Sequence, residues 1–218
     1  MTAQVYKTDS LPGQEQKQEL FIRRLGEILK EKRTEAVLAA MDIQNFKSVN
    51  EIWGMNNGNR LLSIIVDQSL KVLGGGESVS RFFKDRFYLL LLGPVNTIKE
   101  RLEAMRRQIE AEFVRCIGYP YSLVVSLGLC EYNDDVKSGD EWLIRANYAL
   151  ESAELPVGNG FAIYDNAMQK NLQEVRKIEK RMQFGIENNE FRIYLQPQFE
   201  LATGRLSGAE ALVRWISP

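Results

Sequence analysis

The feature that most constrains the fold is an uninterrupted apolar run, Phe87–Leu92. The run is far too short to cross a bilayer, for which a helix needs about 20 residues. A short run without polar alternation is instead typical of a strand that is buried on both faces of its sheet. Ala36–Ile43 and Tyr121–Cys130 predict two further buried strands.

Segments with the apolar spacing of helices alternate with these runs. On this spacing we predict helices over residues 15–32, 56–72, 94–114 and 140–153. Gly54 interrupts a helical stretch before the second of them. Ser78–Phe82 and Phe87–Leu92 flank a short loop and predict a β-hairpin, and Gly160–Tyr164 predicts a short strand. The alternation predicts an α/β sandwich in which helices flank a mainly antiparallel central sheet.

Charge and residue types exclude several functional classes. Lys and Arg number 28 against 29 Asp and Glu, so no overall field directs the chain to nucleic acid or to a membrane surface. The chain has no histidine, which leaves carboxylates as the expected acids, bases and hard-metal ligands. Cys116 and Cys130 fit no metal motif, and isolated thiols without a signal peptide predict a cytoplasmic protein.

The last quarter of the chain follows a different pattern. A helix is predicted over residues 166–187, and one of its faces gathers the apolar side chains of Met168, Leu172, Val175, Ile178, Met182 and Ile186. It is either a surface helix packed on its own domain or a linker helix that transmits state between domains or forms a homodimer. Phe191–Phe199 and Leu206–Trp215 then predict two strands, joined by a turn at residues 202–204.

Several segments resemble GGDEF domains, and they occur in the order that this family has. They are Asp9–Gly13 (D-x-L-T-G in the family), Met41–Glu51 (D-[IL]-D-x-F-K-x-[IV]-N-D), Gly54–Asn59 (G-H-x-x-G-D), Ser126–Gly128 (S-[IL]-G) and Ala146–Leu150 (A-D-x-A-L). The resemblance implies a nucleotidyl-cyclase-like sandwich for residues 1–165. It also implies a role in cyclic-di-GMP signalling.

The motif that names the family falls on the predicted hairpin. By resemblance its first two positions are glycines that let backbone approach the nucleotide phosphates, and here they are Phe83 and Lys84. Asp85 keeps a catalytic carboxylate, and Asp42 keeps the metal carboxylate of the first strand. Arg86 replaces a further metal carboxylate by a positive charge. The resemblance therefore implies a degenerate site, in which two carboxylates expected for Mg²⁺ remain.

The same resemblance places a guanine nucleotide beside Phe46, Lys47 and Asn50. Asn59 stands where the family has an aspartate that accepts from the guanine base, and an amide offers only one acceptor oxygen. Glu154 stands where the family has a phosphate-binding lysine, and an anion is unfavourable beside a triphosphate. Recognition of GTP or GDP is therefore expected to be weakened.

Two more positions depart from the family. Asn159 stands near an expected arginine, and Gly74–Glu77 lacks the arginine of the R-x-x-D product-inhibition motif. Three interpretations stay open for the domain. Asp42 and Asp85 are solvated remnants, or the domain binds GTP or GDP without turnover, or it is a weak diguanylate cyclase that also needs a dimer.

Residues 189–218 resemble the start of an EAL domain, the phosphodiesterase of cyclic-di-GMP signalling. Tyr194–Pro197 is similar to the family's Y-x-Q-P strand, and Gly208–Trp215 contains the E-A-L signature. The residues that the resemblance assigns to the site are Gln196 (ligand), Glu210 (metal), Leu212 (signature) and Arg214 (phosphate). In intact relatives a metal-activated water attacks cyclic di-GMP.

An EAL domain is a barrel, and a barrel of this kind needs about 250 residues. We therefore expect the chain to be a piece of a longer protein, with a GGDEF domain at 1–165, a linker helix at 166–188 and the first EAL strands at 189–218. These strands are expected to pack on the first domain, to pair with another copy or to be poorly ordered. The overall expectation is an inactive GGDEF domain that regulates an attached phosphodiesterase.

Overall fold

The computed structural model describes residues 4–5, 14–31, 35–83, 85–119, 121–155 and 160–216. The chain divides into two compact units, Met1–Met168 and Gln169–Pro218. No helix among the described residues has both the length and the apolar character needed to span a bilayer.

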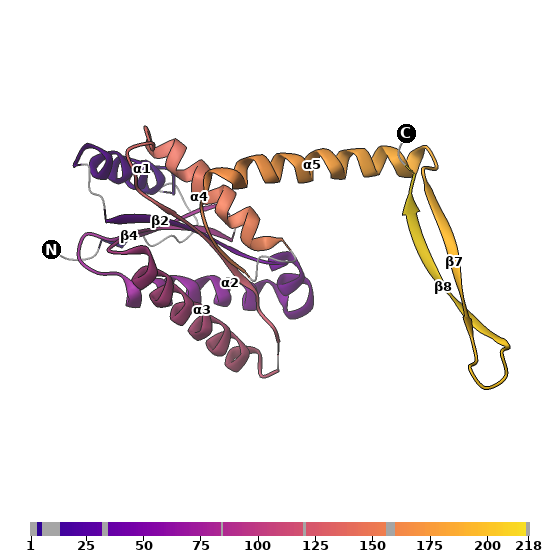
Figure 1. Ribbon diagram of the computed structural model, residues 1–218. Helices are drawn as coiled ribbons and strands as arrows, with labels where there is room; N and C mark the ends of the chain where they lie inside the picture. Colours follow the sequence, from indigo (N-terminus) through magenta and orange to yellow (C-terminus); the bar gives the residue numbers. More distant parts are fainter. Residues whose placement is uncertain are drawn as a thin grey trace. The chain divides into compact units, whose positions relative to one another are not determined.

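Six strands form the sheet of the first unit, in the order β1-β3-β4-β2-β5-β6. Figure 1 labels the two neighbouring strands β2 and β4 of this sheet. Their bounds are Gln4–Val5 (β1), Ala36–Ile43 (β2), Ser78–Phe83 (β3), Arg86–Leu92 (β4), Val125–Glu131 (β5) and Phe161–Ile163 (β6). The two outer pairs, β1 with β3 and β5 with β6, are parallel, and the inner pairs are antiparallel. The predicted α/β class with a mainly antiparallel central sheet is confirmed.

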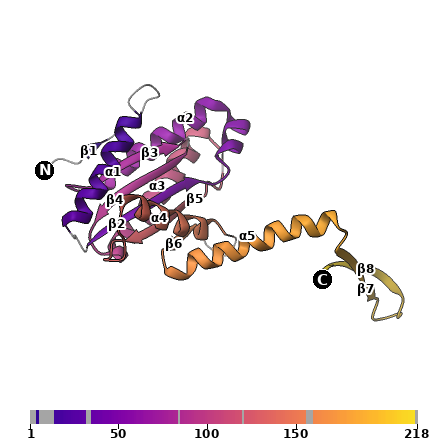
Figure 2. The ribbon, with the colours of Figure 1, turned by 90° about the horizontal axis from the view of Figure 1, so that it is seen from above.

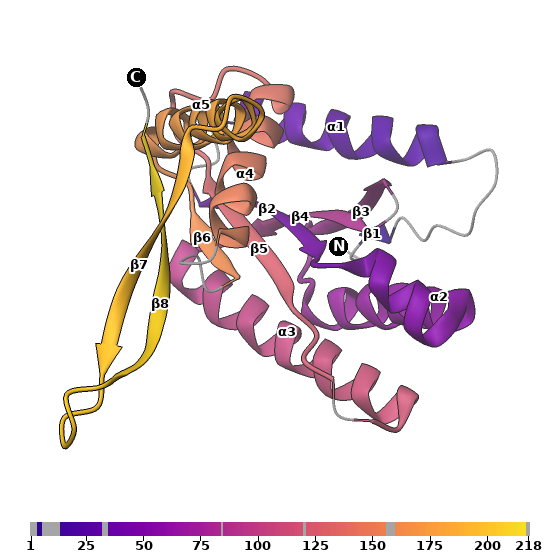
Figure 3. The ribbon, with the colours of Figure 1, turned by 90° about the vertical axis from the view of Figure 1, so that its right-hand side faces the viewer.

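Four helices cover the two faces of this sheet. Their bounds are Gln14–Glu31 (α1), Phe46–Val72 (α2), Val95–Ile117 (α3) and Gly139–Glu154 (α4). Figure 3 shows α1 and α4 on one side of the sheet and α2 and α3 on the other, and Figure 2 looks onto the side that α1 and α4 cover. The sheet is therefore the middle layer of three.

The central strand β2 is apolar throughout because both of its faces are buried. Val37, Ala39 and Met41 belong to the core beneath α2 and α3. Leu38 and Ala40, the alternate residues, belong to the core beneath α1 and α4. The same alternation on β4 explains why the run Phe87–Leu92 is apolar throughout.

The register between β2 and β4 decides which polar groups meet at the end of the sheet. Met41 lies opposite Phe87, and the strands are antiparallel. The next residue of β2, Asp42, therefore lies beside the first residue of β4, Arg86. Core packing holds this register, because a slip by one residue would move each side chain into the opposite core, whose shape it does not match.

The structure differs from the sequence predictions at two places. Gln4–Val5 pairs with β3, although no strand was predicted before the helix that begins near residue 15. Strand β5 begins at Val125, four residues later than expected, since Tyr121 to Val124 make no ladder pairs. Gly54 breaks α2 as predicted, with φ of 81° and ψ of 159° inside the helix. The expected lead-in motif at Asp9–Gly13 lies outside the described residues.

Gly128 allows α4 to pack directly against the backbone of β5. A Cβ at this position would lie 2.0 Å from the backbone nitrogen of Leu150 and 2.6 Å from the carbonyl carbon of Ala149. Neither atom belongs to a flexible side chain, so the helix itself would have to move. The glycine of the S-[IL]-G segment is thus explained by packing.

A buried carboxylate joins three parts of the chain at the opposite end of the strands, namely the loop after α2, strand β4 and helix α3. Glu77 accepts hydrogen bonds from both terminal nitrogens of Arg101, at 3.0 and 2.6 Å, and from the backbone N–H groups of Gly74 and Leu92. Its side chain is 3% exposed. Burial alone would raise the pKa of Glu77, but these hydrogen bonds lower it below the ordinary value. Glu77 ends the segment where a product-inhibition motif was sought, and here it is an internal structural group.

The second unit contains most of helix α5 (Asn166–Glu187) and an antiparallel hairpin of β7 (Phe191–Phe199) and β8 (Leu206–Trp215). The base of the hairpin is fixed to the end of α5: Glu190 pairs with Arg181 at 2.7 Å and accepts from the indole of Trp215 at 3.0 Å. The ring of Trp215 stacks on Phe191. The predicted bounds of the helix and of both strands are confirmed.

We predict that Gly128→Ala lowers the free energy of unfolding by at least about 3 kcal/mol, because the added methyl group collides with backbone. Gly26→Ala is the matched control, since a Cβ there meets nothing within 4 Å on α1. The control should be neutral or stabilising by up to about 1 kcal/mol. Urea unfolding measures both, and equal stabilities of the two variants would contradict the packing argument.

We predict that Glu77→Gln lowers stability at pH 7 by on the order of 3 kcal/mol, because Arg101 loses its buried partner. The pKa of Glu77 is lowered in the folded state. Its contribution is therefore complete above the ordinary carboxyl pKa of about 4.3 and is lost as the pH falls through the lowered folded-state value. Urea unfolding at pH 7 and pH 3 should show the difference from wild type shrinking at pH 3. The exposed Glu100→Gln should show no such difference at either pH.

Candidate functional site

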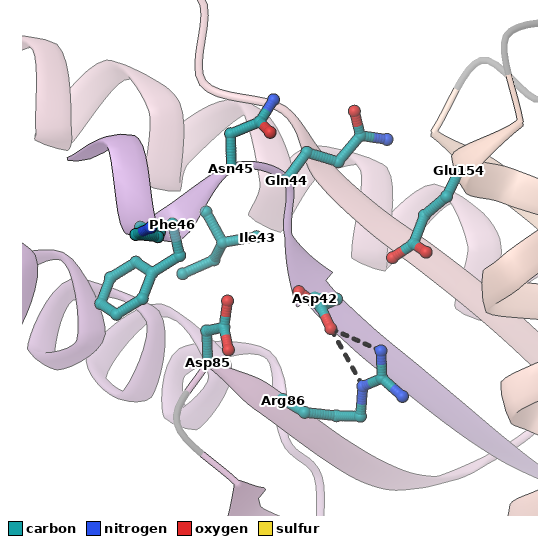
Figure 4. A pocket seen from close by; sticks show the side chains of 9 residues that line it. Asp42, Ile43, Gln44, Asn45, Phe46, Asp85, Arg86 and Glu154 are labelled. Atoms are coloured by element: carbon teal, nitrogen blue, oxygen red, sulfur yellow. Dashed lines mark hydrogen bonds and ion pairs between the residues drawn. The ribbon is translucent and has the colours of Figure 1, made fainter. Parts of the chain in front are cut away.

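An open pocket of about 410 Å³ lies at the end of the sheet where β2 stops and β4 starts. It is lined by residues 42–47, which lead from β2 into α2, by Asp85 and Arg86 of the β3–β4 hairpin, and by Glu154 at the end of α4 (Figure 4). Three elements that are far apart in the sequence therefore converge on one hollow.

The turn from β2 into α2 shapes one wall of the pocket. Asn45 adopts a left-handed conformation with φ of 57°, which asparagine tolerates better than most residues. Its carbonyl accepts the first bonds of α2, from the N–H groups of Ser48 and Val49. Gln44 is fixed to the neighbouring strand by a hydrogen bond from its amide to Ser126 at 2.9 Å. The first turn of α2 thus faces the pocket with its N-terminal end, which favours anions.

An ion pair crosses the floor of the pocket. The Nε and Nη2 atoms of Arg86 donate to the same oxygen of Asp42, Oδ2, at 3.0 and 2.7 Å (Figure 4). The side chains are 32% and 16% exposed, so water screens the pair only in part. Burial lowers the pKa of Arg86, but the hydrogen bonds and charge of Asp42 outweigh burial and raise it. The guanidinium therefore stays charged.

Two more carboxylates border this ion pair. The pKa of Asp85 is raised, first by burial and then by the negative charge of Asp42. The pKa of Glu154 is raised by the same two causes, although the charge of Arg86 partly opposes them. Three carboxylates thus share the pocket with the half-buried guanidinium of Arg86, and they repel one another.

The structure brings together both candidate metal ligands, Asp42 and Asp85, but it does not leave them free. Arg86 donates two hydrogen bonds to one of the two carboxylate oxygens of Asp42, Oδ2 (Figure 4). Within the described part of the chain, no three His, Cys, Asp or Glu residues are arranged to hold a metal ion. As they stand, these residues do not fit a divalent cation, which needs several free oxygen ligands.

The candidate base-binding residues meet beside the pocket, at the break in α2. A Cβ on Gly58 would lie 1.8 Å from Oδ1 of Asn50 and 3.4 Å from the ring of Phe46, so both side chains touch the glycine. In a continuous helix, residues eight apart are about 12 Å apart along the axis. The non-helical backbone of Gly54 makes the contact between Asn50 and Gly58 geometrically attainable.

The remaining candidates of the first unit lie differently. Asn59 follows Gly58 and is exposed. Lys47 is 88% exposed on its side chain and pairs with Glu51 at 3.5 Å. Phe83 is 69% exposed at the end of β3, directly opposite Arg86. Lys84 and Asn159 lie outside the described residues.

In the second unit the four candidate residues share one face of the hairpin. Gln196 lies opposite Glu210, and the positions of Leu212 and Arg214 follow on the same face of β8. All four are at least partly exposed. The structure therefore places together the residues that the resemblance to EAL domains had selected.

Three contributors to the first site were not predicted from the sequence. Gln44 and Asn45 line the pocket. Gly58 lies outside the lining, but it contacts the side chains of Asn50 and Phe46. A signal for the first two was present, because they directly follow the buried strand that ends at Asp42. Gly58 was noted only as a matching glycine, and nothing in the sequence revealed its contact with Asn50.

The first unit matches a known family. The family model "Diguanylate cyclase, GGDEF domain" matches residues 10–160. The fold is similar to the GGDEF domain of DgcB from Caulobacter crescentus, solved in complex with c-di-GMP, with a TM-score of 0.58 and 19% identity. That match covers 69% of this chain and 89% of the other. At this identity the likeness shows the fold alone.

Two curated relatives come from Pseudomonas aeruginosa. The bifunctional diguanylate cyclase/cyclic di-GMP phosphodiesterase MucR is 26% identical over 185 residues, which are 82% of this chain and 26% of MucR. The cyclic di-GMP phosphodiesterase NbdA is 25% identical over 218 residues, which are 99% of this chain and 28% of NbdA. The chain thus spans about a quarter of the length of the curated relatives it matches.

Proposed function

The chain belongs to the diguanylate cyclase family of GGDEF domains, and from this premise we propose that it acts in cyclic-di-GMP signalling as a catalytically inactive, regulatory GGDEF domain. The module that it regulates is, in this proposal, an attached EAL phosphodiesterase. Residues 1–165 are the GGDEF domain, 166–188 the linker helix and 189–218 the first EAL strands. Cyclic di-GMP is then the substrate of the intact parent.

The observation that carries the proposal is the ion pair between Arg86 and Asp42. By resemblance, position 86 should supply a carboxylate to a divalent metal ion. A guanidinium about 4 Å from such an ion would repel it by on the order of several kcal/mol at an effective protein dielectric. GTP turnover in this family depends on that metal, so the charge reversal supports an inactive site.

The hairpin beside the ion pair supports the same conclusion. Phe83 stands at the first glycine position of the motif and lies directly opposite Arg86. A phenyl group there fills space that backbone would otherwise leave to phosphate. Glu154 adds a negative charge on the far side of the pocket, where a triphosphate needs a cation.

Two observations support the attached phosphodiesterase. Gln196, Glu210, Leu212 and Arg214 occupy one face of the second-unit hairpin. MucR and NbdA, both named as cyclic-di-GMP phosphodiesterases, match the chain over 82% and 99% of its length. In this proposal α5 links the two domains, and its apolar stripe is a candidate surface for homodimer formation.

The first test is GTP turnover. We expect no cyclic di-GMP above background when the purified chain is incubated with GTP and Mg²⁺ and the products are separated by chromatography. Measurable synthesis by the wild type would reject the inactive assignment. The combined reversion Phe83→Gly/Lys84→Gly/Arg86→Glu should raise synthesis if the rest of the site is sound, and it serves as the positive control.

A second candidate function, a GTP or GDP sensor without turnover, is favoured by the contact of Asn50 and Phe46 with Gly58. These groups offer an amide and an aromatic ring to a base independently of the metal carboxylates.

We predict for this second candidate that GTP raises the melting temperature of the wild type and of the control Gly26→Ala. Gly58→Ala should lose the rise, because its methyl group would displace the Asn50 amide. Differential scanning fluorimetry with millimolar GTP and GDP measures the effect. A wild type without any shift at these concentrations would reject the sensor.

A further inference from the structure

We propose that the guanidinium of Arg86 is a built-in cation that takes the place of a divalent metal ion in this pocket. The domain then keeps its acidic pocket folded without metal and binds metal only when Arg86 is removed. The inference rests on the proposed function and deepens it, since a pocket neutralised from within would account for the proposed inactivity. The family implies a bound metal ion in this pocket, but the residues that line the pocket do not fit one.

The position of the guanidinium is set by the sheet and not by a flexible surface contact. Asp42 and Arg86 lie beside each other on neighbouring strands, because Met41 is opposite Phe87. Two nitrogens of Arg86 converge on one oxygen of Asp42. A guanidinium presents its donors in a fixed plane, so this arrangement holds the carboxylate in one orientation.

The charge balance of the pocket depends on this one side chain. Asp42, Asp85 and Glu154 bring three carboxylates to the lining, and the described lining holds only Arg86 and Lys47 as cations. Lys47 is 88% exposed and pairs with Glu51, so it does little to neutralise the pocket floor. Without Arg86 the three carboxylates would face one another with only water between them.

Removing Arg86 therefore changes what the pocket attracts. Carboxylate oxygens are the preferred ligands of hard divalent cations, and Asp42 and Asp85 already lie in one hollow. A metal ion and Arg86 cannot both hold Oδ2 of Asp42. The two cations are thus linked through competition for the same atom, and loss of one should strengthen the other.

The test compares Mn²⁺ binding and thermal stability without nucleotide. By electron paramagnetic resonance, wild type should bind Mn²⁺ no more tightly than millimolar, and Arg86→Gln should bind it at least about tenfold more tightly. In EDTA, Arg86→Gln should melt below wild type, and millimolar Mn²⁺ or Mg²⁺ should restore its melting temperature. The same ions should leave the wild-type melting temperature unchanged.

Two control variants separate the site from general charge effects. Arg107→Gln makes the same charge change at an exposed position of α3, which does not line the pocket, and should gain no Mn²⁺ affinity. Asp42→Asn combined with Arg86→Gln removes the shared ligand and should abolish the gain.

Three results would overturn the inference. The first is that the wild type binds Mn²⁺ at micromolar concentration and that Asp42→Asn removes this binding. The second is that Arg86→Gln folds but shows neither tighter Mn²⁺ binding nor a change of melting temperature with metal. The third is that Arg86→Gln stays unfolded even with Mn²⁺. The last counts against it because a metal ion should then replace the lost guanidinium. Tight wild-type Mn²⁺ binding without turnover would reject this inference alone, and cyclic-di-GMP synthesis would reject the proposed inactivity.

Discussion

Strand β2 is hydrogen-bonded to β4 on one side and to β5 on the other, and both of its faces are buried. This double pairing is the constraint on which the rest of the first unit depends. A slip of one residue would move every apolar side chain of the strand to the opposite core. The register that places Asp42 beside Arg86 is therefore a consequence of core packing, and the site inherits its rigidity from the sheet.

The charges of single side chains, and not the arrangement of the backbone, determine the chemistry of the site. The backbone brings residues 42, 85, 86 and 154 to one pocket whatever their charges are. A carboxylate at position 86 would complete a ligand set for a cation from solution, whereas Arg86 supplies the cation itself. Architecture alone thus does not decide activity, because the same scaffold holds a metal-dependent site or an internally neutralised one.

Much of the fold was predictable because burial on both faces leaves a strong local signal. Continuous apolar runs gave β2 and β4, and helical spacing gave the flanking helices. Gln4–Val5 carried no such signal, since the pairing of so short a strand is decided by its neighbour β3. The motif positions predicted that Asp42, Asp85 and Arg86 share a site. Their ion pairing and the contact of Asn50 with Gly58 were not predictable, because both depend on distances across strands or across a helix break.

The hairpin of the second unit presents apolar side chains on one face and its charged and amide side chains on the other. A free two-stranded ribbon does not need this division. Ile193, Leu195 and Val213 lie on one face and are 59–70% exposed, whereas Gln196 and Glu210 lie on the other face. Two strands cannot bury an apolar face by themselves. An exposed apolar face opposite a face that carries Gln196, Glu210 and Arg214 beside Leu212 is useful only where the apolar face packs on further structure and the other face lines a polar space. That requirement supports the proposal that the hairpin belongs to a larger phosphodiesterase domain, in which Glu210 would meet its partner ligands.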